Sequence, residues 1–244
     1  NASGITLRLD NVNALGAGVL EINAGTVNLN GYSPSLSGIR IPDGGSGTIR
    51  TAGSVVASTF LDLGTTAGAT LKIDNGALAN PVAAPVSSTT LTVNGPSTLG
   101  VVGTGLSTGT FPLIAHTGAI GGAGGFAGIT LALPPGVSGN LTDNPGSLDV
   151  TITGIEFIKW TNAAATGNWN IATDINWKTA TGLVDTTYQQ NASGGHSVLF
   201  NESEPQASPV AINIPAVVSP NAVSINNPTK DYVFSGQSIS GAGA

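Results

Sequence analysis

The chain has no cysteine and no methionine, and it is poor in charged and aromatic side chains. Of its 244 residues, 8% are charged and 5% are aromatic, whereas about 25% of residues are charged in typical soluble domains. The lack of cysteine excludes disulfides, thiolate metal ligands and cysteine nucleophiles. Because neither a methionine nor a signal peptide precedes Asn1, we expect a processed or excised piece of a longer chain.

Positive charge is scarce and dispersed, and long apolar runs are missing. Seven basic residues stand against thirteen acidic ones, for a net charge of −6. The basic residues are never adjacent in the sequence: Arg8, Arg40, Arg50, Lys72, Lys159, Lys178 and Lys230. We expect no nucleic-acid partner, because such partners require a basic surface. No apolar run reaches the roughly 18 residues of a membrane helix, so direct membrane insertion is not expected either.

The residues that are present are typical of many short strands joined by tight turns. The chain has 35 glycines and 14 prolines, and 40% of it is hydrophobic. Apolar and polar residues alternate over short segments that end at Gly, Asn, Asp or Pro, which predicts strands rather than helices and an all-β fold. The predicted strands are Ile5–Leu9, Val19–Ile22, Thr70–Ile73, Thr90–Val93, Ile129–Leu133, Leu148–Ile152 and Val210–Ile214.

A degenerate unit recurs in the first part of the chain. It consists of an apolar–x–apolar triplet, then Asn or Asp, then Gly within two residues, and then a further apolar position. We take Leu20, Ile49, Leu71 and Leu91 as equivalent, which gives steps of roughly 20–30 residues. Repeats of this length are typical of a parallel β-helix, or β-solenoid, whose rungs each contain two or three short strands. Packed β-sandwich modules are the alternative architecture.

Two domains are predicted from a change in composition near Gly154. Residues 1–154 are predicted to form solenoid rungs and a closing set of strands, with a flexible turn at the glycine-rich segment Gly118–Gly128. Residues 155–244 are predicted to form a second β module. The tryptophans fall within eighteen residues near the start of that module: Trp160, Trp169 and Trp177.

Two stretches resemble a known family. The segment Gly18-Val-Leu-Glu-Ile-Asn-Ala-Gly-Thr-Val-Asn-Leu29 resembles the autotransporter-associated β-strand repeat of bacterial passenger domains. The tryptophan spacing, followed by Tyr232-Val-Phe-Ser-Gly236, resembles the module that opens many such repeat blocks in large secreted proteins. The resemblance implies an exported, surface-attached or shed protein with a right-handed parallel β-helix and no catalytic residue set.

Residues that could carry chemistry are few. His116 and His196 each adjoin a hydroxyl residue, but no Gly-x-Ser-x-Gly elbow is present, so we expect surface or turn roles for both. Most acids stand alone, and only Glu202 and Glu204 lie close together in the sequence. β-Helix enzymes that cleave polysaccharides need two or three clustered carboxylates, which makes that activity the weakest of the functional hypotheses.

Two segments have side chains suited to binding. The loop Asn201–Glu204 offers oxygen ligands for calcium, but no EF-hand or calcium-binding nonapeptide is present, so we expect a solvated loop. The three tryptophans either fill a core or cap, or stack on sugar rings as a carbohydrate or partner contact.

The expected function is mechanical rather than chemical, with no catalytic, cofactor-binding or metal site. We expect a secreted structural protein of the bacterial cell surface that self-associates into an extracellular filament, through β-strand contacts or chain continuation. The main alternative is an adhesin or carbohydrate-binding passenger module that contacts carbohydrate or a host surface.

Overall fold

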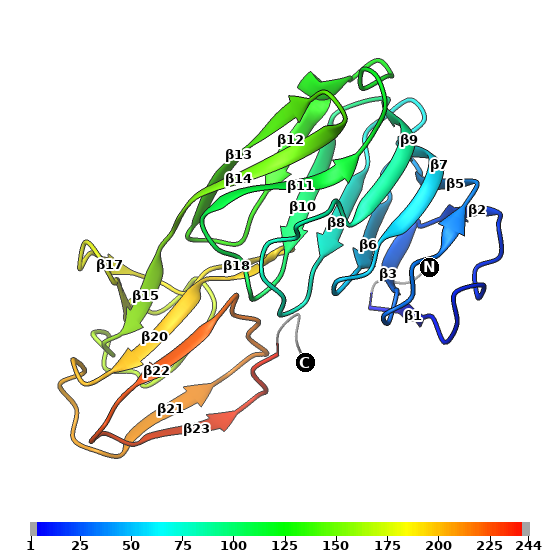
Figure 1. Cartoon of the computed structure of the whole chain (residues 1–244). Coiled ribbons are helices and arrows are strands. Elements are labelled where there is room, and N and C mark those ends of the chain that lie inside the picture. The colour runs from blue at the N-terminus through cyan, green and yellow to red at the C-terminus, as the bar shows by residue number, and fades with distance from the viewer. Residues whose placement is uncertain (1–3, 241–244) are drawn as a thin grey trace. The chain divides into compact units, whose positions relative to one another are not determined.

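The computed structural model of the chain describes residues 4–240 and consists of strands and turns (Figure 1). Over this range there is no α-helix, and the one helical element is the 3-10 turn η1 (Phe126–Gly128). The prediction of an all-β fold is therefore confirmed. Each of the seven strands predicted from alternation overlaps an observed strand, whereas η1 lies where the sequence predicted only a flexible turn.

The chain divides into two compact units. The first contains residues 4–132 and 139–153, and the second contains residues 133–138 and 154–240. The main division lies one residue from the boundary expected between residues 154 and 155. The segment 133–138, expected in the first domain, belongs to the second unit. Two hydrogen bonds hold it there: Asn191 Nδ2 donates to Leu133 O at 3.0 Å, and Glu156 N donates to Gly136 O at 2.8 Å.

One sheet of the first unit has six strands, and all of its pairings are parallel. In sheet order the strands are β1 (Thr6–Arg8), β3 (Ala24–Asn28), β6 (Ser46–Arg50), β8 (Thr70–Asp74), β10 (Ser97–Val102) and β12 (Ile129–Ala132).

The other sheet of the first unit has eight strands. In sheet order seven of them are β13 (Val137–Asn144), β14 (Ser147–Ile155), β11 (Gly109–Ala115), β9 (Val86–Val93), β7 (Val56–Leu63), β5 (Gly38–Ile41) and β2 (Val19–Glu21), and β4 (Ser35–Leu36) pairs with β7. Pairing is parallel from β2 to β11 and antiparallel between β11 and β14. From β5 to β12 successive strands alternate between the two sheets, so the chain passes repeatedly from one to the other.

The parallel register stacks apolar side chains in columns. In the six-stranded sheet, each of the following residues is the direct partner of the next: Leu7, Val27, Ile49, Ile73 and Val101. Ile49, in the middle of this column, is 0% exposed. Burying such a side chain contributes about 1.5–3 kcal/mol to folding, so the columns are the main source of the unit's stability.

The registers correct the alignment of the repeat. Leu20 and Leu91 share one column of the eight-stranded sheet, whereas Ile49 and Leu71 lie in the six-stranded sheet. The inner faces of both sheets pack together, since a Cβ on Gly47 of β6 would lie 3.1 Å from the side chain of Ile41, which belongs to β5 of the eight-stranded sheet. Strands of both sheets therefore present the same apolar–x–apolar pattern to one core, and the pattern alone does not assign a strand to its sheet.

Turns that follow neighbouring strands are joined by asparagine side chains. Asn30 Nδ2 donates to Leu9 O at 2.8 Å, and Asn94 Nδ2 donates to Gly64 O at 2.8 Å. In each case the side-chain amide in the turn after one strand donates to a backbone carbonyl in the turn after the neighbouring strand. That carbonyl thereby gains a hydrogen-bond partner.

The second unit contains three sheets. The largest has five strands, in the order β17 (Asp185–Thr186), β16 (Trp177–Thr179), β15 (Phe157–Trp160), β20 (Ser197–Asn201) and β22 (Val223–Asn226). The two-stranded sheets are β18 (Gln190–Asn191) with β19 (Gly194–Gly195), and β21 (Val210–Ile214) with β23 (Tyr232–Gly236). The pairings β15–β20, β20–β22 and β21–β23 are parallel, and those of β16 are antiparallel.

Candidate functional site

The three tryptophans lie at the centre of the core of the second unit. Trp160, Trp169 and Trp177 are each 0% exposed, and their rings meet edge to face, with centroids 5.0 Å apart for Trp160–Trp177 and 5.3 Å for Trp169–Trp177. Tyr188 and Phe200 complete the aromatic cluster. Rings in this position have no face open to a sugar. Of the two roles considered for these residues, core packing or contact with a carbohydrate or partner, their burial favours core packing.

The two histidines lie in different units, and His116 is buried whereas His196 is partly exposed. His116, expected at the surface or in a turn, is only 5% exposed. Its Nδ1 lies 3.0 Å from Gly118 O, and its Nε2 lies 3.1 Å from Asp143 Oδ1 without hydrogen-bond alignment. In the second unit, Gln189 N donates to His196 Nδ1 at 2.9 Å. Each ring is held by backbone groups near its own turn.

The two acids of the loop Asn201–Glu204 accept hydrogen bonds from the protein, Glu202 through both carboxylate oxygens and Glu204 through Oε1 alone. Glu202 accepts hydrogen bonds from Thr229 N, Thr229 Oγ1 and Lys230 N, which lower the pKa of its carboxyl group. Glu204 is buried, and burial raises its pKa. Across residues 4–240 no three acid, histidine or cysteine side chains come together as metal ligands. The loop is thus stabilised by N–H donors where calcium coordination had been considered.

An apolar edge is exposed where the first unit begins. Leu7 of β1 occupies the same column as the buried Ile49, yet it is 49% exposed, because β1 is the edge strand of its sheet. Ile5 and Val19 beside it are also exposed. A small cavity of about 70 Å³ opens between β1, β2 and β3. Within the described part of the chain, no strand covers this edge.

A second apolar edge is exposed at the last strands of the second unit. Ile225 of β22 is in register with the fully buried Phe200, yet it is 58% exposed. Val223 on the same strand and Val233 on β23 are exposed as well. Within residues 4–240, β22 and β23 are edge strands of their respective sheets. Both edge strands carry exposed apolar side chains.

The structure also brings together two cations that the sequence keeps apart. Lys159 of β15 and Lys178 of β16 are direct partners across an antiparallel pair. The sequence shows no basic patch because the two lysines are nineteen positions apart. The sequence does contain one signal for this pair. Each lysine is next to a tryptophan in its strand, Trp160 or Trp177, and because both tryptophans are buried the two lysines lie on the outer face of the sheet.

Residues 4–240 contain no helix long and apolar enough to cross a membrane. Comparisons with protein-family models, with curated proteins and with solved structures find no match to this chain.

Proposed function

We propose that this protein is a structural component of an extracellular bacterial fibre or surface filament, and that its copies join head to tail by strand addition. The observation that carries the proposal is the Leu7 column. Its inner members are buried, whereas the member on the edge strand is apolar and half exposed. Stacked-repeat proteins normally cover such ends with polar caps, so an apolar end favours a partner that continues the stack.

Each unit is, in this proposal, a β-solenoid. The support in the first unit is the alternation of strands between two sheets, with parallel partners roughly 20–30 residues apart along the Leu7 column, as one solenoid rung requires. In the second unit β20, β21, β22 and β23 alternate between two sheets in the same way. A strand that pairs in parallel can accept the next strand at a spacing of about 4.8 Å.

The two edges suit a head-to-tail contact. The head is the apolar edge of β1 and β2, and the tail is the apolar edge of β22 and β23. Each presents two strands from two sheets. Leu7 in the head, and Val223 and Ile225 in the tail, are exposed although their direct partners on the neighbouring strand are buried. A head that binds a tail leaves another head and another tail free. Such a heterologous contact extends into a filament rather than closing into a dimer.

Secretion and a bacterial surface location are part of the proposal. They are supported by the resemblance of Gly18–Leu29 to passenger-domain repeats and by the absence of cysteine, which removes any need for oxidative folding. The charged fraction of 8% fits a fibre whose strands pack closely along its length.

The head-to-tail contact is tested with two charge variants, Leu7→Lys in the head and Ile225→Lys in the tail. Sedimentation velocity and negative-stain electron microscopy measure assembly as the protein concentration rises. The wild-type chain is expected to form filaments, and each variant alone is expected to stay monomeric. Val82→Lys, at a loop position that is 98% exposed, is the matched control and should assemble normally.

Mixing the two variants separates this mechanism from others. Leu7→Lys keeps an intact tail and Ile225→Lys keeps an intact head, so an equal mixture should form a heterodimer that grows no further. A wild-type chain that stays monomeric at every concentration, or filaments formed by Leu7→Lys alone, would contradict the proposal. Circular dichroism establishes that each variant is folded.

A further inference from the structure

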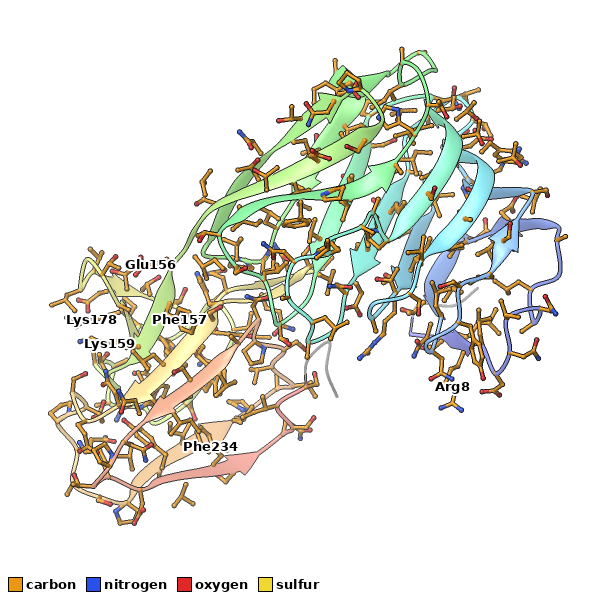
Figure 2. All side chains as sticks on the ribbon, in the orientation of Figure 1. Arg8, Glu156, Phe157, Lys159, Lys178 and Phe234 are labelled. Carbon is orange, nitrogen blue, oxygen red and sulfur yellow. The ribbon has the colours of Figure 1, made fainter. Side chains whose placement is uncertain are left out.

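Two like charges face each other on the outer surface of the five-stranded sheet. Lys159 and Lys178 are direct cross-strand partners, and Figure 2 labels both on this unit. Their sequence neighbours Trp160 and Trp177 are fully buried, so the lysines point away from the core. Like charges placed opposite each other in an antiparallel pair destabilise a sheet. An anion bound between the two ammonium groups would offset this repulsion.

The protein supplies only part of that compensation. Lys178 Nζ forms an ion pair with Asp185 Oδ1 at 2.9 Å. Lys159 has no carboxylate within 4.0 Å among the described residues, and its partner on the other side is Leu199 of β20. Most other basic side chains do have an acidic partner: Arg8 pairs with Asp10, Arg40 with Asp62 and Arg50 with Asp74. One positive charge therefore remains uncompensated at Lys159.

The two lysines line a groove of about 410 Å³. Its other lining residues come from three loops, after β15, between β16 and β17, and after β20: Thr161, Ala163, Leu183, Ser203 and Pro205. The hydroxyl groups already donate inside the protein, Thr161 Oγ1 to Asn176 O and Ser203 Oγ to Asn201 Oδ1. The ammonium groups are thus the donors open to a ligand, while Leu183 and Pro205 provide apolar walls.

We propose that this groove binds the carboxylate-bearing sugar of an acidic polysaccharide. A uronate carboxylate accepts hydrogen bonds from Lys159 Nζ and Lys178 Nζ, and the C–H face of its ring packs against Leu183 and Pro205. Charge-assisted bonds of this kind are about twice as strong as neutral ones, so the carboxylate directs binding. A free phosphate or sulfate supplies the charge without the apolar face. This inference does not depend on filament formation, because all of its residues lie within the second unit.

The test measures binding of trigalacturonate to the full chain by isothermal titration calorimetry and by tryptophan fluorescence. Trp160 and Trp177 lie next to the two lysines on the same strands but point into the core, so calorimetry is the primary readout and a change in their emission is a secondary one. The neutral trisaccharide maltotriose and inorganic phosphate are the comparison ligands. The key variant is Lys159→Gln. Lys72→Gln is its matched control, since Lys72 lies on β8 of the other unit and likewise has no acidic side chain within ion-pair distance in the described structure.

Trigalacturonate is expected to bind with a dissociation constant of about 1 mM or tighter, more strongly than phosphate, and maltotriose is expected not to bind. Lys159→Gln should weaken binding by about tenfold or more, the loss expected for one charged hydrogen bond, and Lys72→Gln should leave it unchanged. Raising the salt concentration should weaken binding further by screening the charges.

Equal binding by the wild type and by Lys159→Gln would overturn the proposal, and so would equal binding of maltotriose. Phosphate binding as strong as that of trigalacturonate would show an anion site without selectivity for a sugar, which also contradicts it. Lys159→Arg serves as the second variant. It keeps the positive charge and should bind trigalacturonate with an affinity within a few-fold of the wild type. If both variants lose binding, the loss comes from a disturbed structure, and if only Lys159→Gln loses it, the loss comes from the missing charge.

Discussion

Thr65 donates two hydrogen bonds to Asp43, from N to Oδ1 at 2.6 Å and from Oγ1 to Oδ2 at 2.7 Å. Asp43 follows β5, and Thr65 follows β7, the next strand of the sheet. The same arrangement joins Glu202 after β20 to Thr229 after β22. In both cases an acid in one turn accepts hydrogen bonds from a threonine in the turn after the neighbouring strand, and so holds the two turns together. These acids stand alone in the sequence because their threonine partners lie a full strand-and-turn passage farther along the chain.

The Asp43 contact should make the first unit sensitive to acid. Hydrogen bonds from the backbone and side chains of Thr65 and Thr66 hold the pKa of the Asp43 carboxyl well below its ordinary value of 3.8. A lowered pKa means that the contact stabilises the fold fully above the pKa of the unfolded chain, and that this contribution is lost as the pH falls through the lower pKa of the folded state. We expect the free energy of unfolding to decrease as the pH is lowered from about 5 to about 2.

Urea denaturation of the wild type and of Asp43→Asn across this pH range measures the contribution. The variant should be less stable than the wild type near neutral pH, and the difference should shrink as the pH falls, because protonated aspartate and asparagine are both neutral. Asp10→Asn is the control, since Asp10 is exposed and, among the described residues, forms an ion pair only with the nearby Arg8. A difference that stays constant with pH would show that the charge of Asp43 is not involved.

The strands and the all-β class were readable from the sequence because they depend on local alternation. Thr70–Ile73 alternates polar and apolar residues and forms most of β8, with Leu71 and Ile73 buried. The register was not readable, because it depends on which strands become neighbours. The steps along a column are unequal because the turns differ in length, and turn length is not encoded by the apolar–x–apolar pattern.

The candidate sites could be predicted only where they depend on residues close together in the sequence. The tryptophans were recognised as a cluster, and their role was decided by packing against Tyr188 and Phe200, which lie farther along the chain. The burial of His116 was missed because its charged partner, Asp143, lies on a later strand, β13. The groove at Lys159 was missed for the same reason. Each depends on strand pairing rather than on a local motif.

Close backbone contact between successive turns leads to a prediction at Gly68. A Cβ atom at this position would lie 1.4 Å from Pro96 O and 2.3 Å from Pro96 C, both backbone atoms. Since backbone cannot rotate away as a side chain can, Gly68→Ala should force the turns before β8 and β10 apart. We expect a loss of about 1–3 kcal/mol in the free energy of unfolding, the usual cost of overpacking.

Gly18→Ala is the matched control, because a Cβ there meets no atom within 4 Å. Chemical denaturation followed by circular dichroism compares both variants with the wild type. Gly68→Ala should lower the midpoint clearly, while Gly18→Ala should leave it nearly unchanged. Similar midpoints for all three proteins would mean that the two turns are not packed as tightly as described.

His196 should make the second unit less stable in mild acid. Burial lowers the pKa of its imidazole below the ordinary value of 6.5. The hydrogen bond from Gln189 N to Nδ1 points the same way, because Nδ1 accepts a bond only when it carries no proton. The neighbouring ring of Tyr188 is neutral in this range, since burial raises its pKa. The unfolded chain therefore takes up a proton first as the pH falls below about 6.5, and the stability of the folded unit decreases.

His196→Asn separates this titration from other effects of acid, because the asparagine Oδ1 can accept the same backbone N–H without a change of charge. His116 is present in both proteins, so its contribution cancels in the comparison. All three tryptophans lie in the second unit, and their fluorescence during urea unfolding therefore reports on that unit alone. The wild type should lose stability between about pH 7 and pH 5 while His196→Asn stays nearly level. Parallel profiles for the two proteins would place the pH dependence elsewhere in the unit and leave His196 as a packing residue.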